Sequence, residues 1–247
     1  MSVKNQFSKY AKEYKNHNII QQIVAKSLVR ELKIQPKRIL ELGCGSGQIF
    51  NHIKWEIDFY KAIDFSASMC ELHPKAKNIE VKCFDFDTED FLDDIKDDSY
   101  DVVLSSSALQ WSKDLSRIVK TLSYITNEIN AVLFTSTTFK TIQEITNTKS
   151  PILDENSIKE AFAKYFKCEF ETIMYKLEFD NKKDLFDYIK KSGVSGGNSS
   201  LNFKDAKKLY KENLTPGQFI FERLKNGLKV IPDFYRSDLQ NEFDKVW

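Results

Sequence analysis

Between residues 36 and 135, the chain alternates short apolar runs with longer segments in which apolar residues recur three or four positions apart. The apolar runs have the length of buried strands, and the spacing between them is typical of amphipathic helices. Strands are expected at residues 38–42, 59–63, 79–84, 100–105 and 129–134. A regular succession of strand and helix predicts a parallel sheet with right-handed crossovers.

Different patterns flank this alternation. A helical pattern over residues 7–32 precedes it, and this helix is expected to lie against the edge of the sheet. After residue 135 the chain becomes more polar, and the segment 219–224 suits either a last antiparallel strand or a helix. The remaining elements expected there are a short helix before residue 144, helices at 157–166, 182–192 and 203–211, and a strand at 168–179.

The first expected strand runs into three glycines at alternate positions, Gly43, Gly45 and Gly47, within E-L-G-C-G-S-G. Glycine tolerates positive φ and lacks a Cβ, so the backbone can bend sharply and approach a ligand closely. The spacing differs from the G-x-G-x-x-G that binds a dinucleotide pyrophosphate. Glu41 would repel phosphates and suits a cationic or amine-bearing ligand. A tight loop without a ligand is the alternative.

Acidic residues follow the second and third strands. Asp64 comes 21 residues after Gly43 (64 − 43), where an acidic residue in a Rossmann-like unit accepts hydrogen bonds from ribose hydroxyls. A turn or helix cap is the alternative for Asp64. Asp85 and Phe86 could bind the amine and the ring of adenine, although Asp87 competes with Asp85 for this role. Phe65 and Met69 offer further apolar surface to the same ring.

The fourth strand ends in Ser105 and leads into S-S-A-L-Q-W, which contains Gln110 and Trp111. A buried strand that ends in serine, glutamine and tryptophan is expected to reach a pocket. A helix N-terminus with one packed tryptophan is the alternative. The ends of parallel strands meet at one edge of the sheet, so these residues, the glycines and Asp64 should lie close together.

Composition narrows the functional classes. Lysine and arginine number 37 against 36 acidic residues, and the net charge of +1 gives no general attraction to nucleic acid or membrane. No apolar run is long enough to span a bilayer and the N-terminus has no signal sequence, so a cytoplasmic protein is expected. The four cysteines show no metal-binding spacing, which predicts reduced thiols without disulfides or metal. His52 and His73 are interpreted as surface residues without an acidic partner.

The E-L-G-C-G-S-G run resembles the first motif of the class I S-adenosylmethionine-dependent methyltransferases. The resemblance implies a Rossmann-like α/β fold with a mostly parallel sheet of about seven strands, helices on both faces and a small helical lobe on the substrate side. It also implies S-adenosyl-L-methionine as cofactor and S-adenosyl-L-homocysteine as product. The expected cofactor-binding residues are Glu41, Gly43, Cys44, Gly45, Gly47, Asp64, Phe65, Met69, Asp85, Phe86 and Ser105.

One domain of three parts is expected to cover residues 1–247. Residues 1–35 form an N-terminal helical cap, 36–135 the cofactor-binding core, and 136–247 the C-terminal substrate-side portion with its helical insertion.

A narrower resemblance rests on three segments: F-x-x-x-A-x-x-Y at residues 7–14 with the following H-x-x-x-Q, L-S-S-S-A-L-Q-W at 104–111, and residues 177–197. These are similar to the malonyl-[acyl-carrier protein] O-methyltransferases that begin pimeloyl synthesis for biotin. The resemblance implies methylation of the free carboxylate of malonyl-acyl carrier protein or malonyl-coenzyme A by a monomer. Such an acceptor is already an anion, so no general base is required. Tyr14, Gln110 and Trp111 are the candidates for shaping the methyl-transfer site.

Other interpretations stay open. The N-terminal and L-Q-W patterns also occur in trans-aconitate-type carboxyl methyltransferases, and a small-molecule enzyme of that type or of a quinone pathway is the alternative. A catalytically silent assembly factor is a third class, against which the intact glycines and aspartates argue. Arg223, Lys190 and Lys191 are weak candidates for binding the acceptor carboxylate. The lysines of residues 203–211 suit an acidic carrier protein or a merely solvated helix face.

Overall fold

The computed structural model describes residues 18–138, 140–147, 149–177, 183–185, 188 and 221–229. Expectations for the other residues lie outside the described part of the chain. They concern Tyr14 and the remainder of residues 1–17, Lys190 and Lys191, the helix at 203–211, most of the helical lobe, and the side chain of Arg223.

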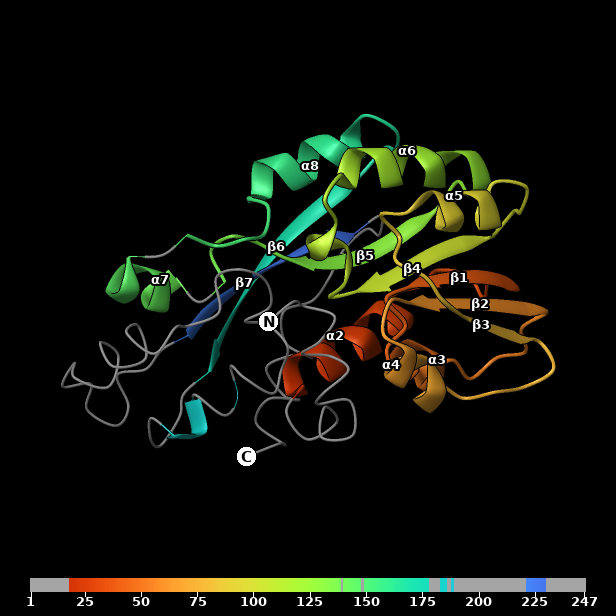
Figure 1. The fold of residues 1–247 in the computed structure, drawn as a ribbon, viewed down its shortest axis with the longest axis horizontal. Helices are drawn as coiled ribbons and strands as arrows, with labels where there is room; N and C mark the ends of the chain where they lie inside the picture. The colour runs from red at the N-terminus through yellow and green to blue at the C-terminus, as the bar shows by residue number, and fades with distance from the viewer. Residues whose placement is uncertain are drawn as a thin grey trace.

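A seven-stranded sheet with the order β3-β2-β1-β4-β5-β7-β6 forms the centre of the molecule (Figure 1). The pairs β1–β2, β2–β3, β1–β4 and β4–β5 are parallel, whereas β7 runs antiparallel to both β5 and β6. The five strands expected from the alternation are confirmed, and the segment near residue 220 is a strand. The bounds are β1 Arg38–Leu42, β2 Phe59–Asp64, β3 Ile79–Cys83, β4 Val102–Ser106, β5 Ile129–Phe134, β6 Glu169–Leu177 and β7 Phe221–Lys229.

Helices cover both faces of the sheet (Figure 1). On one face lie α2 (Ile19–Arg30), α3 (Gln48–His52) and α4 (Ala67–Leu72), and on the other lie α5 (Glu89–Ile95), α6 (Leu115–Ile125) and α8 (Glu155–Ala163). The short 3₁₀ helix η2 (Leu109–Trp111) follows β4, and α7 (Lys140–Thr146) follows β5. The expected class of fold, a Rossmann-like sheet between two helical layers, is confirmed.

Two hydrophobic clusters correspond to the two faces. Val102 and Leu104 of β4 pack in the cluster that contains α2, whereas Val103 between them packs in the cluster that contains α6. Successive side chains of a strand point to opposite faces, so a strand covered on both sides is apolar throughout. This explains why β1, β4 and β5 are nearly uninterrupted apolar runs.

The order of the strands reverses direction between β1 and β4. In open α/β sheets, ligands bind in the crevice outside the carboxyl ends of the strands at such a switch point. The glycine turn after β1 and the serines after β4 flank that crevice, and Asp64 ends the neighbouring strand β2. The topology therefore brings together the residues that the sequence placed at strand ends.

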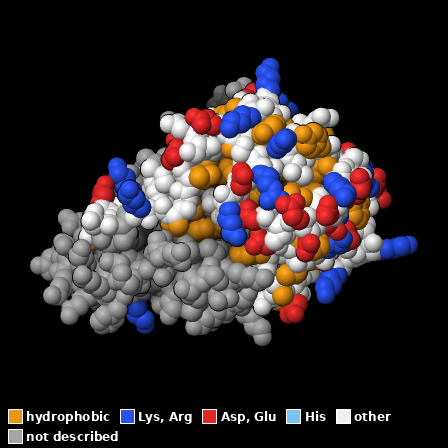
Figure 2. Space-filling model, turned by 45° about the horizontal axis from the view of Figure 1, so that its top comes forward, with side chains coloured by type: hydrophobic (Ala, Val, Ile, Leu, Met, Phe, Trp, Pro, Cys, Tyr) orange, Lys and Arg blue, Asp and Glu red, His pale blue; other side chains and the backbone are white. Residues whose placement is uncertain are grey.

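Figure 2 shows that basic and acidic side chains are interspersed with small apolar areas over α5, α6 and α8. Within the described residues, no helix combines the length and the apolar character needed to cross a bilayer.

A buried ion-pair network joins β2 to α5. The Lys61 ammonium, on a side chain only 4% exposed, lies 2.8 Å from Asp94 Oδ2 and 3.0 Å from Asp98 Oδ2. Lys82 of β3 also binds Asp94. Removing one partner from a buried pair leaves the other charge uncompensated. Lys61 therefore holds two carboxylates next to the sheet.

We expect Lys61→Met to lower the free energy of unfolding by about 2–4 kcal/mol, because the carboxylates of Asp94 and Asp98 would lose the buried cation that they share. Chemical denaturation measures this change. Lys96→Met is the control, since the Lys96–Asp93 pair is exposed, and it should change stability little. Equal effects of the two substitutions would show that the Lys61 network contributes nothing beyond a surface pair.

Candidate functional site

The glycine turn is bound directly to the end of β2. The backbone N–H groups of Gly43 and Cys44 both donate to the carbonyl oxygen of Ile63, at 2.7 and 3.0 Å. All three glycines have positive φ, at +74° for Gly43, +52° for Gly45 and +85° for Gly47. Residues with a Cβ rarely adopt this conformation. The glycines are thus required by the path of the backbone itself.

The carboxylate of Asp64 connects two turns. Its Oδ2 accepts a hydrogen bond from Gly45 N at 2.9 Å, and its Oδ1 accepts one from Ser66 N at 2.8 Å. The residue is 6% exposed, and burial raises the pKa of Asp64 to about 6 against the opposing effect of these two bonds. Asp64 therefore does have the turn-stabilising role that the sequence analysis gave as the alternative to ribose binding. Each carboxylate oxygen can accept a second hydrogen bond, so ribose hydroxyls are not excluded.

The three glycines face different surroundings. A Cβ on Gly43 would lie 2.0 Å from Ala108 Cβ, and one on Gly47 would lie 2.5 Å from Pro74 Cδ. A Cβ on Gly45 would meet no atom of the described part of the chain within 4 Å. Gly43 and Gly47 are therefore needed for packing within the protein, whereas Gly45 faces open space where a ligand can approach the backbone.

Glu41 lies beneath the turn and not at its surface. The side chain is 2% exposed, and the Tyr60 hydroxyl donates a hydrogen bond to its Oε2. Burial, opposed by the Tyr60 bond and aided by the charge of Asp64, raises the pKa of Glu41 to about 8. The carboxyl is thus mostly neutral at pH 7, and Glu41 presents little negative charge to an ammonium group. Its assignment to cofactor binding stays a prediction.

The interpretation of His73 as a surface residue without an acidic partner was wrong. His73 is 2% exposed, and its Nε2 lies 4.0 Å from Glu41 Oε2. Its Nδ1 lies 2.8 Å from the carbonyl oxygen of Pro74, which can only accept, so Nδ1 carries the proton. Burial lowers the pKa of His73. The neutral ring packs against Phe50 and Tyr60, which also contact each other, and it lies next to Gly47.

Three of the four cysteines gather near the end of β2, although the sequence separates them. The Cys70 thiol lies 3.5 Å from Asp64 O, and the Cys83 thiol lies 3.6 Å from Phe65 O. A hydrogen bond from Cys70 and burial raise the pKa of Cys44, whose side chain packs in the core. All four cysteines are free thiols. Any contact of Cys44 with a cofactor would therefore involve its backbone.

After β3, the two competing aspartates have different surroundings. Both carboxylate oxygens of Asp87 lie 3.0 Å from Lys113 N, and Oδ1 also accepts from the Ser112 hydroxyl. Asp85 is half-buried, and of its two oxygens Oδ1 accepts a hydrogen bond from Asp87 N. Asp85 is therefore freer to bind a ligand than Asp87. Phe86 packs in the core, with one edge left at the surface.

At the end of β4 and just after it, four buried polar atoms have no hydrogen-bond partner among the described residues: Ser106 Oγ, Ser107 Oγ, Gln110 Oε1 and Trp111 Nε1. The Gln110 amide nitrogen donates to Ser107 O at 2.7 Å. This bond holds Ser107 in a left-handed backbone conformation, with φ at +60°. Buried polar atoms normally have partners, and leaving one without costs about 1–3 kcal/mol. A strained turn with unused donors therefore follows β4. It lies beside the glycine turn, because Ala108 packs against Gly43.

Sequence reasoning singled out Gln110 and Trp111 but missed Ser106 and Ser107. The signal available was the run of three serines, of which only Ser105 was chosen. The Ser105 hydroxyl donates to Leu42 O at 2.9 Å and is fully buried between β4 and β1. Met69 is likewise buried, whereas Phe65 is half-buried. Their assignments to cofactor binding stay predictions.

Comparison with known proteins agrees with this arrangement. Residues 40–128 match the family model described as a methyltransferase domain. The magnesium protoporphyrin IX methyltransferase of Synechocystis, solved with S-adenosylhomocysteine bound, has a TM-score of 0.55 at 14% identity, covering 72% of this chain and 93% of its own. The fold, the glycine turn and the family match define this protein as an S-adenosylmethionine-dependent methyltransferase.

Within that class, the chain is similar to two curated enzymes named malonyl-[acyl-carrier protein] O-methyltransferase. The enzyme of Bacillus cytotoxicus is 27% identical over 221 residues, covering 79% of this chain and 76% of the relative. The enzyme of Bacillus cereus is 26% identical over 250 residues, covering 88% and 91% respectively. The similarity thus extends well beyond the cofactor-binding core.

Alanine substitutions at two of the glycines should separate folding from binding. We expect Gly43→Ala to destabilise the fold, because its Cβ would overlap Ala108 Cβ, and Ala108→Gly to restore part of the loss. Gly45→Ala should cost only about 1 kcal/mol of backbone strain but weaken S-adenosylhomocysteine binding at least tenfold. Thermal denaturation and calorimetry measure the two effects. Undiminished binding by folded Gly45→Ala would place the cofactor elsewhere.

The buried Glu41 predicts a pH dependence of stability. Between the ordinary value of 4.5 and the folded pKa of about 8, the folded protein retains a proton that the unfolded chain has lost. The free energy of unfolding should therefore fall as pH rises through this window, by at most about 1.4 kcal/mol per pH unit, and level off above it. Glu41→Gln should lack this slope.

Denaturation of the wild type and Glu41→Gln at a series of pH values tests this expectation. Glu71→Gln, at an exposed position of α4, shows the effect of removing a surface carboxylate. If the wild-type and Glu41→Gln profiles run parallel between pH 5 and 8, Glu41 is ionised in the folded protein and the explanation fails.

Proposed function

We propose that this enzyme methylates the free carboxylate of malonyl-[acyl-carrier protein], forming the methyl ester that begins pimeloyl synthesis in biotin biosynthesis. The observation that carries the proposal is the group of unpartnered polar atoms after β4. Three of them can donate a hydrogen bond: the hydroxyls of Ser106 and Ser107 and the Trp111 indole N–H. A carboxylate accepts several hydrogen bonds, and the names of the similar enzymes point to the same acceptor.

The cofactor site is proposed at the glycine turn. Gly45 leaves space against the backbone, the Ser46 hydroxyl is buried without a partner, and Asp64 lies at the adjacent strand end. These features fit S-adenosylmethionine, which when bound supplies an electrophilic methyl group on a sulfonium. The proposed binding residues are Glu41, Gly43, Cys44, Gly45, Gly47, Asp64, Phe65, Met69, Asp85, Phe86 and Ser105.

The residues after β4 would hold the acceptor and exclude water. A carboxylate is ionised at neutral pH, so its oxygen can attack the methyl carbon without losing a proton, and no side chain has to serve as a base. Neutral donors suit this task because they orient the carboxylate without pairing it so strongly that its nucleophilicity is lost. Tyr14, Gln110 and Trp111 remain the proposed residues that shape the site, of which Tyr14 lies outside the described residues.

One assay tests the function. The enzyme is incubated with methyl-labelled S-adenosylmethionine and either malonyl-carrier protein, malonyl-coenzyme A or trans-aconitate, and the label is recovered as a base-labile methyl ester. Preferential labelling of the malonyl thioesters is expected. Preferential labelling of trans-aconitate would favour the small-molecule alternative. If no carboxylate is labelled while S-adenosylhomocysteine binds, the proposed function is wrong.

Two tryptophan variants test the role of the unused donors. Trp111→Phe removes an indole N–H that has no partner among the described residues, and it should raise the KM for the malonyl acceptor about five- to tenfold without weakening S-adenosylhomocysteine binding or stability. Trp55→Phe is the matched control, because its indole N–H donates to Pro36 O at 2.9 Å. That variant should lose stability but keep its KM. Reversed effects would show that Trp111 is a packing residue only.

A further inference from the structure

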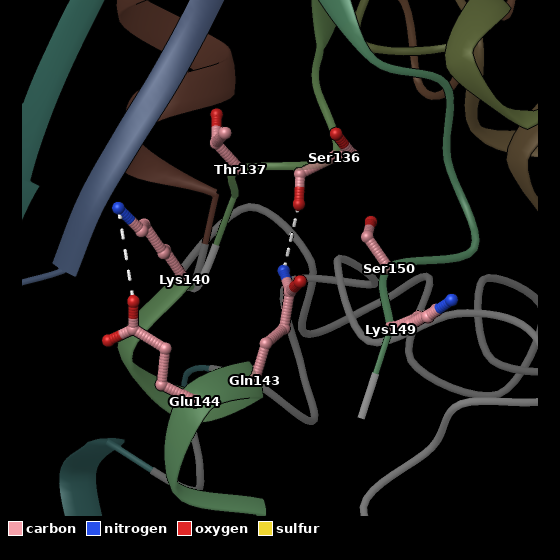
Figure 3. Close-up of a pocket in the computed structure, with 7 residues that line it drawn as sticks. All are labelled: Ser136, Thr137, Lys140, Gln143, Glu144, Lys149 and Ser150. Carbon is pink, nitrogen blue, oxygen red and sulfur yellow. Dashed lines mark hydrogen bonds and ion pairs between the residues drawn. The ribbon is translucent and has the colours of Figure 1, made fainter. Parts of the chain in front are cut away.

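A pocket of about 550 Å³, lined by residues of polar and charged type, opens beyond the carboxyl end of β5 (Figure 3). Figure 3 shows three groups of residues around it: Ser136 and Thr137 from the end of β5, side chains of α7, and the segment before α8. We name it the β5-exit pocket. Its lining residues are Ser136, Thr137, Lys140, Gln143, Glu144, Lys149 and Ser150.

The β5-exit pocket lies one strand over from the proposed acceptor residues. Strands β4 and β5 are parallel neighbours, and Ser107 N donates to Val132 O at 2.8 Å. Ser136 follows Val132 by four residues and leads away from the same edge of the sheet. The pocket volume is within the range of small-ligand sites. A long acceptor bound at Ser106 and Ser107 could therefore extend its distal part into this pocket.

The Gln143 side chain holds the pocket together. Its amide nitrogen donates to the carbonyl oxygens of Ser136 and Thr138, at 2.9 and 2.7 Å, and so ties α7 to the end of β5. The Ser150 hydroxyl accepts from Ile152 N at 3.4 Å, which leaves its O–H group able to donate. A fixed backbone and the Ser150 O–H group are thus both present in the lining.

The charge of the lining favours an anion. Lys140 and Lys149 outnumber Glu144, and they flank the pocket on opposite sides in Figure 3. The Lys140–Glu144 pair is exposed, and its charged atoms lie 3.8 Å apart. Such a pair is weak, so an anion of higher charge can displace the Glu144 carboxylate from Lys140 at little cost in free energy. Lys149 makes no ion pair within the described residues. Its ammonium points outward in Figure 3, and its flexible stem allows it to turn onto a bound anion.

We propose that the β5-exit pocket binds the phosphate group of the phosphopantetheine arm that carries the malonyl thioester. Lys140 and Lys149 would supply the charge, and the hydroxyls of Ser136 and Ser150 the hydrogen bonds, whereas the Thr137 hydroxyl is already bonded to that of Thr135 at 2.7 Å. This inference rests on the proposed function and extends it. The same phosphate occurs in malonyl-coenzyme A and in the carrier-bound arm, so the pocket recognises what the two acceptors share.

The test compares acceptors that differ only in this group. For the wild type, malonyl-phosphopantetheine should have a KM about three- to tenfold lower than malonyl-pantetheine. In Lys140→Gln/Lys149→Gln this preference should disappear, because the KM for the phosphorylated acceptor rises while that for the other stays the same. The affinity for S-adenosylhomocysteine should not change. Malonyl-coenzyme A and malonyl-carrier protein, assayed in parallel, show whether both sources use the pocket.

Two single variants serve as controls. Glu144→Gln should lower the KM for the phosphorylated acceptor, because the competing carboxylate is removed. Lys120→Gln, at an exposed position of α6, should have no effect on the preference. If Lys120→Gln reduces the preference as much as the pocket variants do, the effect comes from net charge and the pocket proposal is wrong.

Two outcomes separate this proposal from the function it rests on. Equal KM values of the wild type for malonyl-phosphopantetheine and malonyl-pantetheine would overturn the pocket while leaving carboxyl methylation intact. If no malonyl thioester is methylated, the function fails, and calorimetry of phosphopantetheine and pantetheine with the enzyme and S-adenosylhomocysteine decides the pocket alone. Equal binding of the two compounds, or undiminished discrimination by Lys140→Gln/Lys149→Gln, would then exclude it.

Discussion

The buried carboxylate of Asp64 is the interaction on which the cofactor side of this enzyme depends. One oxygen holds the backbone of Gly45 and the other holds that of Ser66, so a single side chain sets the position of the turn after β1 and of the chain leaving β2. Burial disfavours the ionised form, as the raised pKa shows, and the two backbone donors partly compensate. A ligand that donates further hydrogen bonds to this carboxylate would favour its charge, so binding and ionisation of Asp64 are expected to support each other.

Apart from the carboxylates of Asp64 and Asp85, the described residues of the site carry little fixed charge. Glu41 is mostly neutral at pH 7, the His73 ring is neutral, and the segment after β4 offers hydroxyl, amide and indole groups. Such an environment suits a reaction between a cation and an anion that yields neutral products. Strong ion pairs with either reactant would stabilise the ground state and raise the barrier, whereas neutral donors fix orientation at lower cost. Charge is instead found farther out, at Lys140 and Lys149 beyond β5.

Most of the architecture could be predicted because the β–α alternation is strong and both faces of the sheet are covered, so strands appear as apolar runs and helices as amphipathic ones. The glycine turn was identified because its backbone geometry requires glycine, and Asp64 because it ends the next strand at a fixed distance from that turn. The positions of His73, Ser106 and Ser107 could not be predicted in the same way. A histidine after a short helix carries no pattern that distinguishes burial from exposure, and only the packing of Phe50, Tyr60 and Glu41 around it decides. Ser106 and Ser107 became candidate acceptor-binding residues only when the structure showed that their hydroxyls have no hydrogen-bond partner among the described residues.

The contact between Gly43 and Ala108 has a consequence for the order of events in catalysis. With no room for a Cβ between them, the turn after β1 and the segment after β4 form one packed unit, although 65 residues (108 − 43) separate them in the sequence. A shift of the turn when one ligand binds must be transmitted to the segment proposed to hold the other. Linkage requires this effect to be reciprocal, so whatever one ligand does to the affinity for the second, the second does equally to the first. The steric contact between these two small residues is thus a route by which binding in one half of the proposed site would affect the other.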